Sequence, residues 1–287
     1  MSSTTFSVFR PTKRQTSVIF ASPHSGRVYT PSFLKQAALD KQTIRSSEDA
    51  FVDDLFDGAT AFGAPFIVAH APRAFIDLNR AHDELDPALI SGLRKSPQSA
   101  RVNSGLGVIP RVVANGRHIY RGKISLNEAN SRIANYWRPY HDALARLISE
   151  STVAFGDAIL IDCHSMPNEA LVASTRRGLT RPDVVLGDRF GGSCSPHIID
   201  QVEAAFAKAG FNVARNQPFA GAYIAQRYGR PAFRQHVVQI EINRSLYMDE
   251  KQIHPLQSYP QIKSRLNKVI EEISAIGRSV PQSIAAE

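Results

Sequence analysis

The chain has 287 residues, of which 43% are hydrophobic and 21% are charged. This is an ordinary composition for a globular protein that can bury a sizeable core. The formal net charge is +8 at pH 7, but the arginines are scattered along the chain, which favours steering of an anionic substrate over nucleic-acid binding. No run approaches the roughly 18 apolar residues that cross a bilayer, and the N-terminus lacks a signal-peptide core. The two cysteines form neither a disulfide framework nor a CxxC pair, which fits a reducing cytosol. We therefore expect a cytoplasmic protein with no membrane or nucleic-acid partner.

Strands and helices alternate in the first half of the chain. Residues 1–15 are polar and predict an irregular arm. Apolar runs predict strands at 17–21 and 65–69, a short helix is expected at 31–39, and 48–61 has the spacing of an amphipathic helix with Glu48 in its first turn. Residues 73–80 predict a shorter extended segment. The stretch 82–118 is rich in Gly, Pro, Ser and Asn, and it predicts an irregular excursion, a lid or hairpin over the site.

The same alternation continues in the second half. Ser125 to Glu128 match a capping box, which predicts a helix to about residue 150 that Pro139 kinks or splits. Further strands are expected at 159–167, 183–187, 211–214 and 236–242, with helices at 196–209 and 260–276. This order predicts a single α/β domain in which helices flank a mixed central sheet, with its core at about 17–275.

The run Ile159 to Pro167 places Asp162 and His164 near the end of a buried strand. Residues two apart share one face of a strand, so the acid could orient the histidine. His164 could then be a metal ligand, a general base or a structural histidine. Cys163 points to the opposite face, so we expect it in the core rather than as a nucleophile.

Other predicted strand ends carry residues of the same kinds. His24 follows the first strand, Glu241 lies near the end of the last, and Glu48 stands at a helix start. Two histidines and a carboxylate form an open zinc site, at which a bound water can reach a pKa of about 7. A second carboxylate could move the proton, while an arginine and an asparagine could hold a substrate carboxylate.

The motifs at these positions carry a family resemblance. SPHSG at 22–26, DLNR at 77–80, WRPYH at 137–141, DCHSMP at 162–167, LGDRFGGSC at 186–194 and EINRSLYM at 241–248 resemble the N-formylglutamate amidohydrolase family. That family is similar to the zinc carboxypeptidases and to the aspartoacylase and succinylglutamate desuccinylase group. The resemblance implies a mixed sheet between helices, a bound Zn²⁺ and a small anionic N-acyl amino acid as substrate.

The resemblance also implies roles for individual residues. His24 and His164 would bind zinc, and Glu241 would be the general base and acid. Asn79 and Arg80 would hold the substrate carboxylate, with Arg73 as a further candidate. Zinc carboxypeptidases have a glutamate ligand three residues after the first histidine, but Arg27 stands there in this chain. The acidic ligand must therefore come from elsewhere, and the family resemblance, which includes an acid that leads into the same helix, implies Glu48, with Asp49 as the alternative.

These residues together predict a zinc amidohydrolase that removes a formyl group from an acidic amino acid such as glutamate. Two other interpretations remain open at this stage. The substrate could be another N-acyl amino acid or a short peptide, or the chain could be a binding protein that keeps the fold without catalysis.

Overall fold

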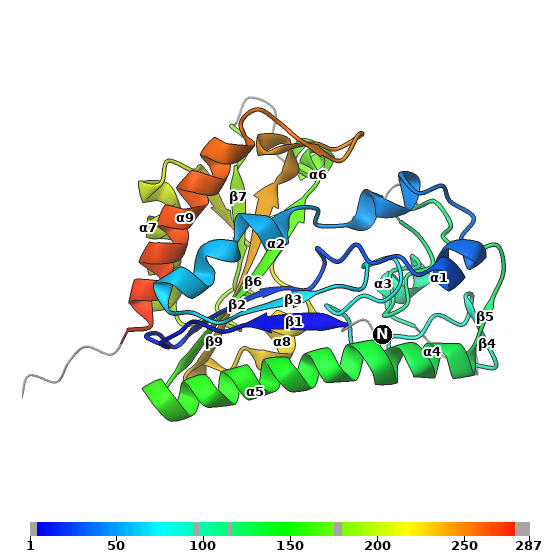
Figure 1. Ribbon diagram of the computed structural model, residues 1–287, viewed down its shortest axis with the longest axis horizontal. Helices are drawn as coiled ribbons and strands as arrows, with labels where there is room; N and C mark the ends of the chain where they lie inside the picture. The colour runs from blue at the N-terminus through cyan, green and yellow to red at the C-terminus, as the bar shows by residue number, and fades with distance from the viewer. Residues whose placement is uncertain (1–4, 94–97, 114–115, 175–179, 279–287) are drawn as a thin grey trace, which may run out of the picture.

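The structure is a computed structural model that describes residues 5–93, 98–113, 116–174 and 180–278. Its centre is a seven-stranded mixed sheet with the strand order β1-β3-β2-β6-β9-β7-β8 (Figure 1). The strands are β1 (Phe6–Phe9), β2 (Val18–Ser22), β3 (Phe66–Ala69), β6 (Ala158–Met166), β7 (Val184–Gly187), β8 (Val213–Arg215) and β9 (Gln235–Asn243). Strands β3, β2, β6 and β9 run parallel, whereas β1 and β7 pair antiparallel with their neighbours β3 and β9. The expected mixed α/β fold is confirmed.

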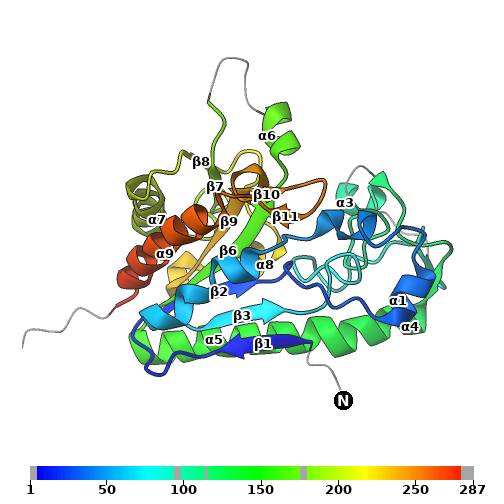
Figure 2. The same cartoon turned by 45° about the horizontal axis from the view of Figure 1, so that its top comes forward.

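Helices cover both faces of the sheet, as Figures 1 and 2 show. The long α5 (Arg138–Phe155) lies along one face, and α7 (Pro196–Lys208) and α9 (Tyr259–Ile276) lie on the other. The shorter helices are α1 (Pro31–Gln36), α2 (Val52–Leu55), α3 (Ala100–Asn103), α4 (Leu126–Arg132), α6 (Asn168–Ser174) and α8 (Tyr223–Tyr228). Two small two-stranded pairings join β4 (Ile90–Ser91) to β5 (Ile124–Ser125), and β10 (Met248–Asp249) to β11 (His254–Pro255). Among the described residues, we find no helix with the length and apolarity that a membrane span requires.

The alternation of side chains along the buried strands sorts the core into two parts. Ile159, Ile161 and Cys163 pack in the cluster that contains the apolar faces of α7 and α9. Leu160 faces the other way, into the cluster that contains α5. Because side chains two apart share a face, Asp162 and His164 continue the α5 side of β6 toward its C-terminal end. The expected core position of Cys163 is therefore confirmed.

The helix start predicted from the capping box is confirmed. The Ser125 side chain accepts a hydrogen bond from the Glu128 backbone N–H, as the capping box predicts. The following helix continues to Phe155 through a π-helical turn at Ile133–Trp137, which ends two residues before Pro139. A π turn releases one backbone hydrogen bond of the helix, which suits a proline that has no N–H to donate.

Three predicted elements differ from the structure. Residues 6–9 form the edge strand β1 rather than an irregular arm, because the segment pairs with β3 and its alternating Phe6 and Val8 pack against the core. Residues 73–80 form turns rather than an extended segment. The helix expected at 48–61 is instead the short α2 followed by a 3₁₀ turn at Asp57–Phe62.

Candidate active site

A cavity of about 480 Å³ lies at the C-terminal ends of the central parallel strands. In open α/β sheets this edge is where ligands bind. Side chains from the segments after β2 and β3, from the ends of β6 and β9, and from the loop before α8 line it. Of the residues predicted from the sequence, the cavity brings together His24, His164, Glu241, Asn79, Arg80 and Arg73.

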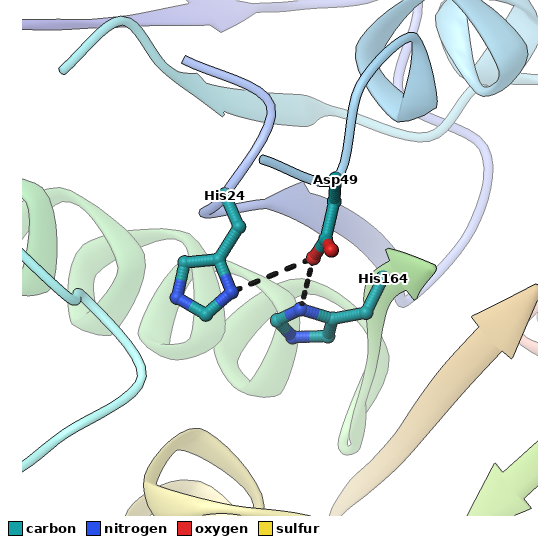
Figure 3. A group of neighbouring side chains, drawn as sticks. All are labelled: His24, Asp49 and His164. Atoms are coloured by element: carbon teal, nitrogen blue, oxygen red, sulfur yellow. Dashed lines mark hydrogen bonds and ion pairs between the residues drawn. The ribbon is translucent and has the colours of Figure 1, made fainter. Parts of the chain in front are cut away.

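His24, Asp49 and His164 form a buried group within this cavity (Figure 3). One ligand atom from each residue lies within 4.8 Å of the others. Asp49 Oδ2 is 2.9 Å from His164 Nδ1 and 3.5 Å from His24 Nδ1. Two imidazoles and a carboxylate that converge in this way can hold a divalent cation and leave further positions for water or substrate.

The opposite nitrogen of each imidazole is bonded to a second carboxylate. His24 Nε2 lies 2.7 Å from Asp77 Oδ1, and His164 Nε2 lies 3.0 Å from Asp162 Oδ2. A histidine that donates its Nε2–H to a carboxylate keeps an unprotonated Nδ1, which is the arrangement seen for metal-binding histidines. In the described part of the chain, His24 Nδ1 is buried without any hydrogen-bond partner. An orphaned nitrogen costs free energy unless a ligand satisfies it, so the donor set fits a cation.

Asp49 and His164 shift each other's pKa in opposite directions. Burial alone would raise the pKa of Asp49, but the hydrogen bond from His164 and the charges of His164 and His24 outweigh burial and hold this pKa well below its ordinary value. Burial would likewise lower the pKa of His164, but Asp162 and Asp49 outweigh it and raise this pKa well above 6.5. A cation that binds at His164 Nδ1 would therefore displace a proton.

The structure does not bring Glu48, the acid chosen from the sequence, into this group. Its carboxylate accepts hydrogen bonds from the Tyr29 hydroxyl at 2.6 Å and from the Arg45 guanidinium at 3.0 Å. The Asp49 backbone N–H donates to the His24 carbonyl, which ties the two segments together. The backbone of Glu48 is extended, and consecutive side chains of an extended segment point to opposite sides, so Glu48 and Asp49 face different ways. The alternative, Asp49, is therefore the acid beside the histidines.

Asp49 is held in place by a residue to which sequence reasoning gave no role. Arg244, directly after β9, donates from its NH2 group to Asp49 Oδ1 at 2.9 Å. Its Nε donates to the Ser165 hydroxyl, and Ser165 in turn donates to Asp49 Oδ1. One carboxylate oxygen is thus fixed by Arg244 and Ser165, while the other faces both histidines. The EINRSLYM motif, which contains Arg244, was the available signal.

Glu241 faces the same cavity from β9. It is the direct register partner of His164 in the parallel pair β6·β9, so both side chains lie on one side of the sheet. Burial is the main cause that raises the pKa of Glu241 to about 7, and the charge of Asp49 adds to it. Gln239 donates to Glu241 Oε1 at 2.9 Å and accepts from the Ala222 backbone N–H, so its amide orientation is determined. A carboxylate with a pKa near 7 is suited to proton transfer at neutral pH.

Asn79 lines the cavity, but its side chain is already bonded within the protein. Its carbonyl oxygen accepts from the Ile224 N–H at 2.7 Å. Its amide nitrogen donates to Asp162 Oδ2 at 3.3 Å and lies 3.1 Å from His164 Nε2. These contacts place Asn79 as a support for the pair formed by His164 and Asp162 rather than as the direct partner of a substrate carboxylate.

The cavity also contains several arginines that could bind an anion. Arg73 forms an ion pair with Asp77. Arg80 is buried and donates to the carbonyls of Asn79 and Leu106, which fixes its side chain. Arg101, from the irregular stretch 82–118, lines the same cavity and was not singled out in the sequence. Cys163 offers no competing nucleophile, because burial raises the pKa of its thiol well above the ordinary value.

Comparison with known proteins gives a consistent result. A sequence model of the N-formylglutamate amidohydrolase family matches residues 16–248. N-formylglutamate deformylase of Pseudomonas aeruginosa is 30% identical over 237 residues, which cover 82% of this chain and 83% of that protein. The corresponding protein of Pseudomonas putida is 28% identical over 236 residues, which cover 81% and 82%.

Solved structures agree with the sequence matches. The crystal structure of N-formylglutamate amidohydrolase from Ralstonia eutropha is similar with a TM-score of 0.89 and 32% identity, over 96% of this chain and 98% of that chain. A gene product of Agrobacterium tumefaciens shares the fold, with a TM-score of 0.64 and 16% identity over 95% of this chain and 96% of the other. The chain therefore belongs to the N-formylglutamate amidohydrolase family.

Proposed function

We propose that this chain is a zinc-dependent amidohydrolase that cleaves N-formyl-L-glutamate into formate and L-glutamate. The observation that carries the proposal is one cavity that contains both a candidate metal group and a raised-pKa carboxylate. The names of the relatives support formylglutamate as the substrate. A positively lined cavity supports a substrate with carboxylates.

His24, Asp49 and His164 would hold the metal ion. Zinc suits a set of two imidazoles and one carboxylate, since it accepts nitrogen and oxygen ligands in an open site. Asp77 and Asp162 would fix the orientation of the two imidazoles. When bound, zinc would activate a water and polarise the formyl carbonyl.

Glu241 would move the proton of the reaction. As a base it would take a proton from the attacking water, and as an acid it would then give that proton to the amide nitrogen that leaves as an amine. A pKa of about 7 allows both steps near neutral pH. Gln239 bonds to Oε1, so the other carboxylate oxygen is the one that would carry the proton.

Arg80, assisted by Arg73, would bind the substrate carboxylate next to the reacting amide. Arg80 keeps N–H groups that are not hydrogen-bonded to any residue of the described ranges. Fixing the substrate by a charged, hydrogen-bonded contact holds the amide in a reactive orientation. Asn79 would act indirectly, through His164.

The test combines two measurements on the purified protein. Zinc content is measured by atomic emission, and formate release from N-formyl-L-glutamate is measured with and without added zinc. We expect about one zinc per chain, by analogy with open three-ligand sites, and release that depends on the metal. Zinc without release would direct the search to other N-acyl amino acids or short peptides. Failure to bind zinc at all would overturn the enzyme proposal in favour of a non-catalytic binding protein.

The variant Glu241→Gln tests the role of the carboxylate in proton transfer. Because Glu241 is outside the metal group, zinc content should stay at the wild-type level. Turnover should fall about 100- to 10,000-fold, the usual contribution of a general base. His164→Ala should lose both zinc and activity. Wild-type turnover by Glu241→Gln would remove this residue from the mechanism.

A further inference from the structure

Arg101 lies at the wall of the cavity and has no charged partner among the described residues. It lies on α3, and its side chain lines the cavity together with Arg80 and Leu106. Its side chain forms no hydrogen bond or ion pair with any residue in the ranges that the structure describes. The proposed proton transfer and metal binding do not use it.

The backbone connects Arg101 to Arg80. Arg80 Nε donates to the Leu106 carbonyl at 3.0 Å, and the Leu106 N–H donates to the Arg101 carbonyl at 2.9 Å. Arg111 adds a second support, since it is paired with Asp86 and donates to the Asn103 carbonyl. Arg101 therefore has a defined position relative to Arg80 although its side chain is exposed.

The arginines that line the cavity have different charged neighbours. Arg73 lies beside the candidate metal group, because its Nε is 3.0 Å from Asp77 Oδ2 and Asp77 Oδ1 is 2.7 Å from His24 Nε2. Burial lowers the pKa of Arg80, and the charges of Arg73 and Arg101 lower it further, although Asp77 opposes them. Arg80 thus has both Arg73 and Arg101 as charged neighbours in the cavity. No carboxylate within the described residues forms an ion pair with Arg80 or Arg101.

Arg80 and Arg101 are thus two neighbouring guanidinium groups without a carboxylate partner among the described residues. Such a pair fits two carboxylates on one ligand. The amide that is cleaved is attached to the same carbon as the α-carboxylate, so this carboxylate lies close to the reacting groups. The side-chain carboxylate of a glutamate derivative lies further from the amide. We propose that Arg101 binds this side-chain carboxylate and thereby determines the preference for an acidic amino acid, which rests on the function proposed above.

The experiment compares two substrates of nearly equal shape. N-formyl-L-glutamate carries a side-chain carboxylate, whereas N-formyl-L-glutamine carries a neutral amide in its place. Steady-state formate release is measured for the wild type, for Arg101→Met and for the control Arg117→Met. Arg117 is exposed on the same stretch and donates to the Thr43 hydroxyl. The control removes the same charge away from the cavity, so it reports any general loss of electrostatic steering.

We expect Arg101→Met to raise KM for N-formyl-L-glutamate about 10- to 100-fold, as for a lost charged hydrogen bond. The values for N-formyl-L-glutamine should stay within about twofold of wild type, because a hydrogen bond to a neutral group contributes less than one to an ionised group. Arg117→Met should behave as wild type. Equal effects on both substrates, no effect on either, or the same effect from the control would overturn the proposal.

A binding measurement separates this proposal from the proposed function. Glutarate and its monoamide are titrated calorimetrically into the wild type and into Arg101→Met. A wild-type preference for glutarate that disappears in the variant supports the role of Arg101 even if no formate is released. Absence of formate release alone would overturn the proposed reaction, whereas a preference unchanged in the variant would overturn the role of Arg101.

Discussion

Glu48 and Asp49 are adjacent acids with different environments. Glu48 bonds to Arg45 and Tyr29, and Asp49 faces His24 and His164. The family resemblance favoured Glu48, because it implies an acid at this position, leading into the predicted helix. The decisive contact, from the Asp49 N–H to the His24 carbonyl, joins segments that no local pattern connects.

A pair of conservative variants tests which of these two acids binds the metal. Asp49→Asn keeps the shape of the side chain but removes its charge, so we expect zinc affinity to fall by at least about 10- to 100-fold, the scale on which changes around a metal site act. Glu48→Gln should keep zinc affinity and activity close to wild type. Competition with a colorimetric chelator measures both affinities. Zinc loss in Glu48→Gln with retention in Asp49→Asn would reverse the assignment.

At the scale of elements, the segment 48–61 shows how tertiary structure overrides periodicity. Phe51 has a left-handed backbone with φ of 67°, which is costly for a residue with a side chain. The helix α2 therefore begins only after Phe51, at Val52. The apolar residues Val52, Leu55 and Phe56 are buried as their spacing predicts. The sequence thus predicted which side chains enter the core but not where the helix begins.

Residues 218–222, which precede α8, form one wall of the cavity. The position of this wall also depends on tertiary contacts. The β7 residue Gly187 lies against this wall, where an added Cβ would be 2.6 Å from the Ala220 carbonyl carbon and from the Gly221 nitrogen. The Arg189 N–H donates to the Ala220 carbonyl at 2.7 Å. The LGDRFGGSC motif, which has no side chain among the cavity residues, therefore positions the wall. A resemblance of motifs could point to this segment but not to what it contacts.

The variant Gly187→Ala should displace this wall. We expect a loss of about 1–3 kcal/mol in the free energy of unfolding, the usual effect of overpacking, together with a higher KM. Gly122→Ala is the matched control, because an added Cβ there meets nothing within 4 Å. Urea unfolding and steady-state kinetics measure both effects. Equal stability and KM in the two variants would show that the wall tolerates the added methyl group.

At the scale of the whole molecule, His141 connects α5 to the segment before Asn79 and to α8. The structure buries this histidine. Its Nε2 lies 2.9 Å from the Leu78 carbonyl, and its Nδ1 lies 2.9 Å from the Tyr228 hydroxyl. Burial is the main cause that lowers its pKa to about 3. The folded protein therefore holds His141 neutral under conditions in which the unfolded chain protonates it.

This difference predicts a dependence of stability on pH. Between the unfolded pKa of about 6.5 and the folded pKa of about 3, only the unfolded state binds the proton. Stability should then fall as pH decreases through this range, by up to about 1.4 kcal/mol per pH unit. Urea unfolding at pH 7.5 and 5.5 should show a change that is smaller in His141→Gln by about 1 kcal/mol. An identical change in both proteins would contradict a neutral buried His141.

The position of β9 has a consequence for synthesis on the ribosome. Within the seven-stranded sheet it is the last strand along the chain, yet it lies between β6 and β7. Until residues 235–243 emerge, β7 and β8 have no strand that joins them to β1, β3, β2 and β6. A nascent chain that ends earlier already contains His24, Asp49 and His164, but it lacks both the closing strand and Glu241. The growing chain therefore gains a continuous sheet and its candidate base from one and the same segment, so a chain that ends before β9 lacks the group for the proposed proton transfer.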